Sequence, residues 1–380
     1  MGALSGYRVI EMAGIGPCPM AGMLLADMGA EVICIERSSA PVFFDGNKNM
    51  SARGKKSIVL DVKTDQGLEA LLRLVDGADV LLEGYRPGVA EKLGFGPEVC
   101  AQRNPKLVYG RMTGWGQTGP LAKTAGHDIN YIAITGALHA MGQANQKPMI
   151  PLNLVGDFGG GTMFLISGVL AALLECKASG TGQVVDAAMI DGAANLMWMC
   201  HSFAAVNQWN THKRGVNLLD GGAYFYNSYE TSDGKYISVG SLEPQFYQLL
   251  IEKLGLDPEQ FNINSQNDPR TWQEGADVFT ELFKTRTRDQ WCELLEGTEV
   301  CFAPILELSE VPEHVQNSQR DAYIEVDGYL QPAPAPRLSR TPSTVEHGQR
   351  QRGADTVEIL KQVGYSETEI KNLKDQAVIG

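Results

Sequence analysis

The segment AGHDINY places His127 directly before Asp128 and close to Asn130. An imidazole exchanges protons near neutral pH, so His127 is a candidate general acid and base. Gly126 before it fits a tight backbone passage. The polar residues after it are potential caps for the helix that INYIAITGALHAMG indicates, and a helix N-terminus offers N–H donors to a developing oxyanion. The alternative is a purely structural histidine.

Two carboxylates are further candidates for proton transfer. Asp157, in LNLVGDFGGGTMF, lies between an apolar run and three glycines, directly before an apolar helix. It either caps that helix or faces a ligand on which the glycine-rich backbone can close. Glu243, in VGSLEPQFY, precedes a helix that begins at Pro244. It is either a surface capping residue or a carboxylate that orients His127 from another domain and fixes its tautomer.

Basic residues gather in the first hundred positions, several of them just after a predicted strand. They are Arg37, Arg53, Lys55, Lys56, Lys63, Arg86 and Lys92. The carboxyl ends of the strands of an open α/β sheet are where ligands bind. A local cluster of positive charge in a chain of net charge −13 favours a phosphate-bearing ligand over nucleic acid. Solvated surface charge is the alternative.

The first half of the chain alternates predicted strands and helices, which is typical of a parallel sheet covered by helices. Strands are expected at residues 7–12, 31–36, 57–62, 79–84, 107–112 and 182–189. Helices are expected at residues 19–30, 64–78, 163–174 and 190–209, with Thr64 as the N-cap of the second.

The alternation of predicted strands and helices ends at about residue 222. Residues 222–240 indicate a hairpin around the Asp233–Gly234 turn, and helices dominate from there on. Residues 331–342 are a Pro-rich extended linker, and one helix is expected in the tail. We therefore predict a large Rossmann-like α/β domain at 1–210 and a smaller α+β domain at 222–325. Residues 326–380 would be a linker and a C-terminal segment that returns to the large domain.

A glycine loop follows the first strand in EMAGIGPCP. Gly14 and Gly16 occupy the first two glycine positions of a dinucleotide-binding fingerprint, and Glu36 resembles its ribose-binding acid. Pro19 stands where the third glycine is needed, so the sequence favours a Rossmann-like unit that does not bind a nicotinamide.

Composition narrows the class of protein. A hydrophobic content of 43% and a charged content of 20% are typical of a globular chain, and the negative net charge argues against nucleic acid or an anionic membrane as partner. The cysteines form no C-x-x-C pair and no metal-binding spacing, which fits a reducing compartment. No secretory signal, membrane span or peroxisomal tripeptide is recognised, so we expect a cytoplasmic protein.

Five segments in order, AGHDINY, PLNLVGDFGGG, GQVVDAAM, NLLDGGA and LEPQFY, resemble the motif series of α-methylacyl-CoA racemases. These enzymes belong to the family III CoA-transferase superfamily, also called CaiB/BaiF-like. The resemblance extends from about residue 5 to residue 345.

The resemblance implies a 1,1-proton transfer at the α-carbon of a 2-methylacyl-CoA thioester, with no cofactor and no metal, because CoA is part of the substrate. His127 and Asp157 would be the two bases on opposite faces of that carbon. Glu243 matches the family glutamate that contacts the catalytic histidine, and Asp128 matches a neighbouring polar residue. The implied assembly is an interlocked homodimer, with each site between the large domain of one subunit and the small domain of its partner.

The resemblance also implies contacts to the CoA part of the substrate. Arg37 matches an arginine near the nucleotide, and Lys92 stands at a position associated with arginine in related racemases, where lysine keeps the charge but loses the bidentate fork. The other implied contacts are Leu60, Asp61, Val62, Lys63, Gly84, Tyr85, Arg86, Gly126, Ile129, Asn130 and Tyr131.

Two alternatives stay open. A family III CoA-transferase would use Asp157 as a nucleophile, but the pair His127–Asp128 and the short LDGGA segment at 219–223 oppose it. A catalytically inactive CoA-ester binding protein would need neither base. The preferred acyl chain is not readable from the sequence.

Overall fold

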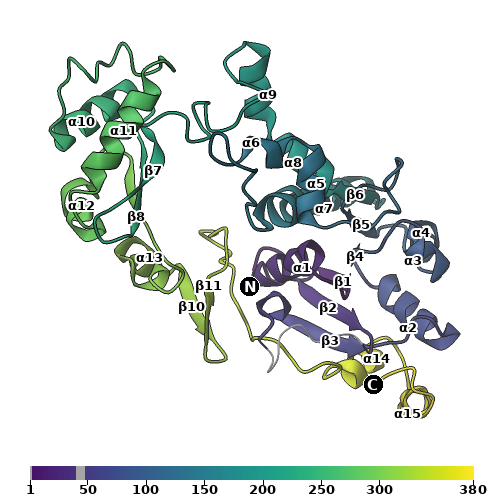
Figure 1. Ribbon diagram of the computed structural model, residues 1–380. Coiled ribbons are helices and arrows are strands. Elements are labelled where there is room, and N and C mark those ends of the chain that lie inside the picture. Colours follow the sequence, from purple (N-terminus) through teal and green to yellow (C-terminus); the bar gives the residue numbers. More distant parts are fainter. Residues whose placement is uncertain (1, 40–47) are drawn as a thin grey trace. The chain divides into compact units, whose positions relative to one another are not determined.

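The computed structural model describes residues 2–39 and 48–380, and these form two compact units (Figure 1). The first unit consists of Met1–Thr135, Leu152–Leu196 and Arg320–Gly380, and the second of Gly136–Pro151 and Met197–Gln319. The units differ from the predicted ranges 1–210, 222–325 and 326–380 chiefly at residues 136–151 and 197–210, which belong to the second unit. Residues 136–151 show how such a segment is held. That segment is held by the second unit, where Nε of Arg214 donates to the main-chain oxygen of His139 at 2.8 Å.

The described residues of the first unit contain a six-stranded parallel sheet in the order β3-β2-β1-β4-β5-β6. The strands are β1 (Arg8–Met12), β2 (Glu31–Glu36), β3 (Lys55–Val59), β4 (Val80–Glu83), β5 (Val108–Thr113) and β6 (Val184–Ala188). The strand order reverses between β1 and β4, as in a doubly wound Rossmann-type sheet. The predicted α/β class is therefore confirmed.

Helices cover both faces of this sheet because side chains along each strand point alternately to opposite faces. Ile10 and Met12 of β1 lie in one core with α2, α4, α14 and α15, whereas Val9 lies in the other with α1 and α7 (Figure 1). The helices of this unit are α1 (Pro17–Asp27), α2 (Asp65–Asp76), α3 (Val89–Lys92), α4 (Pro97–Arg103), α5 (Asp128–Ile134), α7 (Met163–Ser179), α8 (Met189–Leu196), α14 (Thr356–Gln362) and α15 (Glu367–Asp375), with the short 3₁₀ turn η1 (Met50–Ala52) and the π-helix η2 (Leu154–Thr162).

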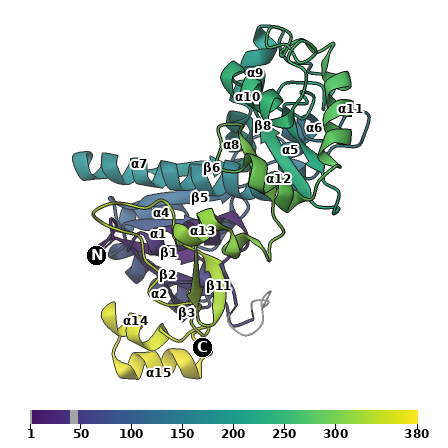
Figure 2. The ribbon, with the colours of Figure 1, turned by 90° about the vertical axis from the view of Figure 1, so that its left-hand side faces the viewer.

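The apolar helix α7 is buried on one side only, whereas the sequence predicted a buried helix. Leu165 and Val169 are fully buried on the side that packs against β5 and β6 (Figure 2). Leu174 is 72% exposed. Within the described ranges, one helix, Leu154–Ser179, is long and apolar enough to cross a membrane by length and composition alone.

Several predicted boundaries were wrong. The expected single helix at 190–209 is two helices, α8 and α9 (Trp198–Ala205), separated by Met197. The expected single tail helix is the pair α14 and α15. The linker prediction missed a hairpin, β10 (Tyr323–Val326) with β11 (Tyr329–Pro332). The Thr64 cap is confirmed, since its hydroxyl accepts the N–H of Gly67 at 3.1 Å.

The second unit contains a three-stranded antiparallel sheet among its described residues, with helices packed on it. The predicted hairpin is confirmed, with Gly234 in the left-handed region at φ 73°. Its core is largely aromatic and includes Phe279, Phe283 and Trp291. The elements are α6 (Ala137–Ala140), α9, β7 (Tyr226–Glu230), β8 (Tyr236–Gly240), α10 (Pro244–Leu254), α11 (Trp272–Phe283), α12 (Arg288–Leu295), β9 (Phe302–Ile305), η3 (Val311–Glu313) and α13 (Val315–Gln319).

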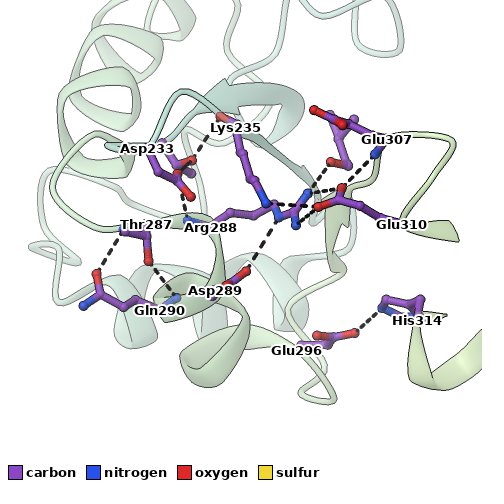
Figure 3. A network of polar contacts seen from close by, with 12 residues as sticks. Asp233, Lys235, Thr287, Arg288, Asp289, Gln290, Glu296, Glu307, Glu310 and His314 are labelled. Carbon is purple, nitrogen blue, oxygen red and sulfur yellow. Dashed lines mark hydrogen bonds and ion pairs between the residues drawn. The ribbon is translucent and has the colours of Figure 1, made fainter.

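An ion-pair network ties three segments of this unit together (Figure 3). Both terminal nitrogens of Arg288, on α12, donate to Glu310 at 2.7 Å. Lys235, next to the hairpin turn, also donates to Glu310 at 3.0 Å. The network fixes the segment after β9 to the hairpin and to α12.

Candidate active site

The residues expected to contact substrate lie at the carboxyl edge of the parallel sheet. Arg37 follows β2, residues 60–63 follow β3, and residues 84–86 follow β4. The loop after β5 leads to His127, and the loop after β1 contains Gly16. Because parallel strands end at the same edge, these segments come together where α/β proteins bind ligands.

His127 is the N-cap residue of α5, and its side chain is exposed. Its backbone N–H donates to Oδ1 of Asn130 at 3.1 Å, so the capping role predicted for Asn130 is confirmed. Asp128 does not cap this helix. Its side chain turns inward, and Oδ2 accepts the backbone N–H of Asp157 at 2.7 Å. The two segments that carry the predicted bases are thus hydrogen bonded to each other.

Close ring packing fixes the backbone that leads to His127. Trp115 and Tyr131 meet edge to face, with ring centroids 4.8 Å apart. A Cβ atom on Gly126 would lie 2.8 Å from the Tyr131 ring and 2.9 Å from the Trp115 ring. The phenol of Tyr131 also donates to the main-chain oxygen of Gly126. Only glycine fits this passage, which confirms the tight turn predicted at Gly126.

Asp157 lies inside the π-helix η2, which continues directly into α7. It is therefore not the cap of an apolar helix, and that alternative is excluded. The glycines around it permit close packing within the protein, and the predicted closure of their backbone on a ligand stays a prediction. A Cβ atom on Gly156 would lie 2.5 Å from Oδ2 of Asp128, and one on Gly160 would lie 2.6 Å from the backbone nitrogen of Ala193.

The carboxylate of Asp157 is half-buried, and its pKa is raised above the usual range. Burial is the largest cause, opposed by the side-chain amide of Asn153, which donates to Oδ2 at 3.1 Å. The charge of Asp128 raises the pKa of Asp157 further, and His127 lowers it. A carboxylate with a raised pKa is a stronger base, which suits the abstraction of a carbon-bound proton.

Two residues next to Asp157 were missed by the sequence analysis as site residues. Asn153 precedes Asp157 by four positions, a spacing that places both on one side of a helical segment. Gly16 was considered only as part of a nucleotide loop, yet a Cβ atom there would lie 3.3 Å from Oδ2 of Asp157. The glycine loop after β1 therefore borders the candidate base.

Four of the predicted basic residues are exposed at the carboxyl edge. Within residues 2–39 and 48–380, Arg37, Lys63, Arg86 and Lys92 form no ion pair, so their charges are available to an anionic ligand. The charge of Arg86 also acts on Tyr131, whose pKa is raised by burial and by Asp157 and lowered by that arginine. The loop after β4 is thus close enough for its charge to act on the segment that follows His127.

The other three residues of the predicted basic cluster do not lie at the ligand-binding edge. Arg53, Lys55 and Lys56 lie at the amino end of β3, not after its carboxyl end. The first two are buried and bind Asp27 and Glu11 at 2.6 Å, and Lys56 binds Glu31 at 2.7 Å. They stabilise the fold and are not free to hold a phosphate group.

A buried network supports the loop after β4 and was not predicted. Oε2 of Glu83 accepts the backbone N–H of Tyr85 at 2.7 Å, and Oε1 accepts Nε of Arg111 at 2.8 Å. Arg111 continues to Glu91, on α3 next to Lys92, at 2.7 Å. The network of Glu83, Arg111 and Glu91 thus fixes both the Gly84–Arg86 loop and the helix that carries Lys92.

Glu243 belongs to the second unit, as the exposed N-cap residue of α10. Its side chain makes no capping hydrogen bond, so its carboxylate is free of that role. The expected contact between Glu243 and His127 stays a prediction. In the described part of the chain, no group of three or more His, Cys, Asp or Glu side chains is arranged to hold a metal ion.

The chain is similar to known proteins over almost its whole length. Residues 4–356 match the profile of CoA-transferase family III. The alpha-methylacyl-CoA racemase of Mus musculus is 43% identical over 379 residues, covering 99% of this chain and 97% of that one. The racemase of the same name from Homo sapiens is 40% identical over 380 residues with the same coverage. The crystal structure of a CAIB/BAIF family protein from Brucella suis has a TM-score of 0.81 at 25% identity, covering 95% of this chain and 99% of that chain.

Proposed function

Because the chain belongs to CoA-transferase family III and matches α-methylacyl-CoA racemases over almost its whole length, we propose that it interconverts the (R) and (S) forms of 2-methylacyl-CoA thioesters. The observation that carries this proposal is that an imidazole, His127, and a carboxylate, Asp157, interact within the first unit. The charge of His127 lowers the pKa of Asp157, and the neighbouring Asp128 is hydrogen bonded to the Asp157 backbone.

The proposed reaction uses the two groups in turn. One base removes the α-proton, and the electron pair of the C–H bond passes into an enolate conjugated with the thioester. The other group returns a proton to the opposite face of the planar carbon, which inverts the centre. The raised pKa of Asp157 supports this role, since a carboxylate of ordinary basicity is a poor match for a carbon acid. Backbone N–H groups at the start of α5 would stabilise the enolate oxygen.

The CoA part of the substrate is proposed to bind along the carboxyl edge of the sheet. Arg37, Lys63, Arg86 and Lys92 supply positive charge there for its phosphate groups. The Gly84–Arg86 loop is held by the buried Glu83 and Arg111, which supports a preformed binding surface. No separate cofactor or metal is needed for a proton transfer of this kind, because CoA activates the acyl group as a thioester.

We further propose that the protein is an interlocked homodimer in which Glu243 of one subunit approaches His127 of the other. Exposed apolar side chains on each unit support covered surfaces, since Leu174 of the first unit is 72% exposed and Trp198 of the second is 63% exposed. With a partner subunit over these surfaces, neither a membrane nor a nucleic acid is required as partner. A cytoplasmic location fits the free cysteines.

The experiment that tests the function is incubation with (S)-2-methylacyl-CoA in deuterated water without any acceptor acid. We expect deuterium at the α-carbon and the appearance of the (R) isomer by NMR, with Asp157→Asn as the control that should form no (R) isomer. CoA transfer to an added acid without exchange would instead make Asp157 the nucleophile of a CoA-transferase. Tight binding of the thioester with neither reaction would identify an inactive binding protein.

A further inference from the structure

We infer that Asp128 is a positioning residue whose buried carboxylate holds the backbone of Asp157 and sets the basicity of the Asp157 side chain. This inference rests on the proposed racemase function, because it assigns Asp157 the role of a base. Asp128 itself lies behind the site and need not touch the substrate.

One backbone hydrogen bond holds the carboxylate of Asp128 against the main chain of Asp157. Asp128 is 6% exposed, and its Oδ2 accepts the N–H of Asp157 at 2.7 Å. This approach requires glycine at position 156, where a Cβ atom would lie 2.5 Å from the same oxygen. Helix α5 and the π-helix η2 are therefore joined at the candidate site by a carboxylate, although a neutral acceptor would satisfy the same N–H group.

Among the described residues, no cationic side chain forms an ion pair with Asp128. Oδ1 is buried and has no hydrogen-bond partner among the described residues. Buried polar atoms are nearly always paired, and an unpaired one destabilises the fold. The negative charge of Asp128 raises the pKa of Asp157, whose backbone the same carboxylate holds.

The other elements around Asp157 bring no second negative charge of this kind. The α5 segment presents His127, Asp128 and the phenol of Tyr131. Helix α1 contributes the uncharged Gly16 and Pro17 at its start, and α8 contacts η2 through Met189 and Ala193. The flanking Asn153 is neutral. Among the described residues, the charges that act on the pKa of Asp157 are therefore those of Asp128, which raises it, and His127, which lowers it.

The pKa directions agree with this arrangement. Burial raises the pKa of Asp157 most, Asn153 lowers it, Asp128 raises it and His127 lowers it. Without Asp128, burial alone would oppose the amide of Asn153 and the charge of His127, and Asp157 would be a weaker base. The carboxylate pair thus keeps Asp157 basic while its backbone stays fixed.

The test uses Asp128→Asn, whose amide oxygen can still accept the Asp157 N–H while the charge is removed. We expect the acid limb of kcat/KM to move to lower pH, with KM unchanged. Proton removal should slow by about three- to tenfold for the isomer that Asp157 deprotonates, and less for the other isomer. Loss of a merely structural contact would slow both isomers equally and leave the pH profile in place, which would overturn the inference.

A second measurement does not depend on turnover. The Asp157 carboxyl is followed by ¹³C NMR of aspartate-labelled protein, and its signal is assigned by comparison with Asp157→Asn. We expect it to titrate at lower pH in Asp128→Asn, or in Asp128→Ser if the first variant does not fold. Asp191→Asn, which removes an exposed carboxylate from α8, is the matched control and should leave the titration unchanged.

The two levels of failure are distinguishable. An unchanged Asp157 titration in both Asp128 variants would overturn the inference, whatever the enzyme does. Absence of α-proton exchange in the unmodified protein would overturn the proposed function, although the titration of Asp157 could still respond to Asp128.

Discussion

Nε of Arg111 donates to Glu83 at 2.8 Å, while the other carboxylate oxygen of Glu83 accepts the N–H of Tyr85 at 2.7 Å. Glu83 is fully buried and Arg111 is 6% exposed. Burial raises the pKa of Glu83, and the Tyr85 N–H and the arginine oppose that rise. A pair of this kind is sensitive to the loss of either partner, because the charge that remains stays buried.

Arg111→Met is therefore expected to lower the free energy of unfolding by about 3 kcal/mol. It should also raise KM for acyl-CoA more than it lowers kcat, because the Gly84–Arg86 loop loses its support. Urea unfolding and steady-state kinetics measure the two effects. Arg103→Met is the matched control, since its partners Glu69 and Asp76 are exposed and its loss should change stability by less than about 1 kcal/mol. Equal effects of the two variants would contradict the prediction.

Asp157→Asn should stabilise the protein at neutral pH while abolishing racemisation. The pKa of Asp157 is raised in the folded state, chiefly by burial, so the folded protein favours the protonated carboxyl. Its contribution to stability is fully present below the ordinary value of 3.8 and is lost as pH rises through the raised folded value. The variant should then melt above the unmodified protein at about pH 8 and level with it at about pH 3.

Differential scanning calorimetry at several pH values measures this difference in Tm. Asp191→Asn, on the exposed side of α8, should show no such pH-dependent gain. A lower Tm for Asp157→Asn at neutral pH would mean that the carboxylate stabilises the fold, contrary to the cause given for its raised pKa.

Gly16→Ala is expected to impair catalysis through the carboxylate of Asp157. Gly16 has φ 74°, which L side chains rarely adopt, and the added methyl would lie 3.3 Å from Oδ2 of Asp157. The backbone strain alone should destabilise the protein by about 1 to 2 kcal/mol. The contact with Asp157 should in addition reduce kcat.

Gly180→Ala separates these two effects. Gly180 ends α7 at φ 80°, and nothing lies within 4 Å of an added Cβ. It should destabilise the protein to a similar degree and leave the exchange rate per folded molecule unchanged. Comparable losses of kcat in both variants would show that stability, and not contact with Asp157, explains the result.

Local signals in the sequence predicted the parts of the fold that depend on local chemistry. The Thr64 cap and the turn at Asp233–Gly234 are set by neighbouring residues, and both are confirmed. The turn at Asp327–Gly328 carries the same signal but was overlooked beside the Pro-rich stretch. It forms the β10–β11 hairpin.

Other features depend on contacts that a sequence does not display. Lys55 reads as a free cation, yet it is buried against Glu11 of a different strand at 2.6 Å. The carboxylate of Asp128 points inward because the backbone at Gly156, a distant segment of the chain, passes close to it. Residue types and order thus pointed to His127 and Asp157, but the packing that tunes them required the structure.

The assembly of the site from two subunits can be tested by combining two inactive variants. His127→Ala is expected to lose about 10²- to 10⁴-fold in exchange rate because it removes an acid–base group. Glu243→Ala should lose less, since this residue is proposed only to orient the imidazole. His127 lies in the first unit and Glu243 in the second, so the two defects can be separated physically.

In the proposed interlocked dimer, each site combines the first unit of one chain with the second unit of its partner. A heterodimer of the two variants would then contain one site with both defects and one site with none. Random pairing in co-expressed chains should restore about a quarter of the unmodified activity. Differently tagged chains purified in two steps should approach half of it. If each site were built within a single chain, every site would carry one defect, and the heterodimer would be no more active than the mean of its parents.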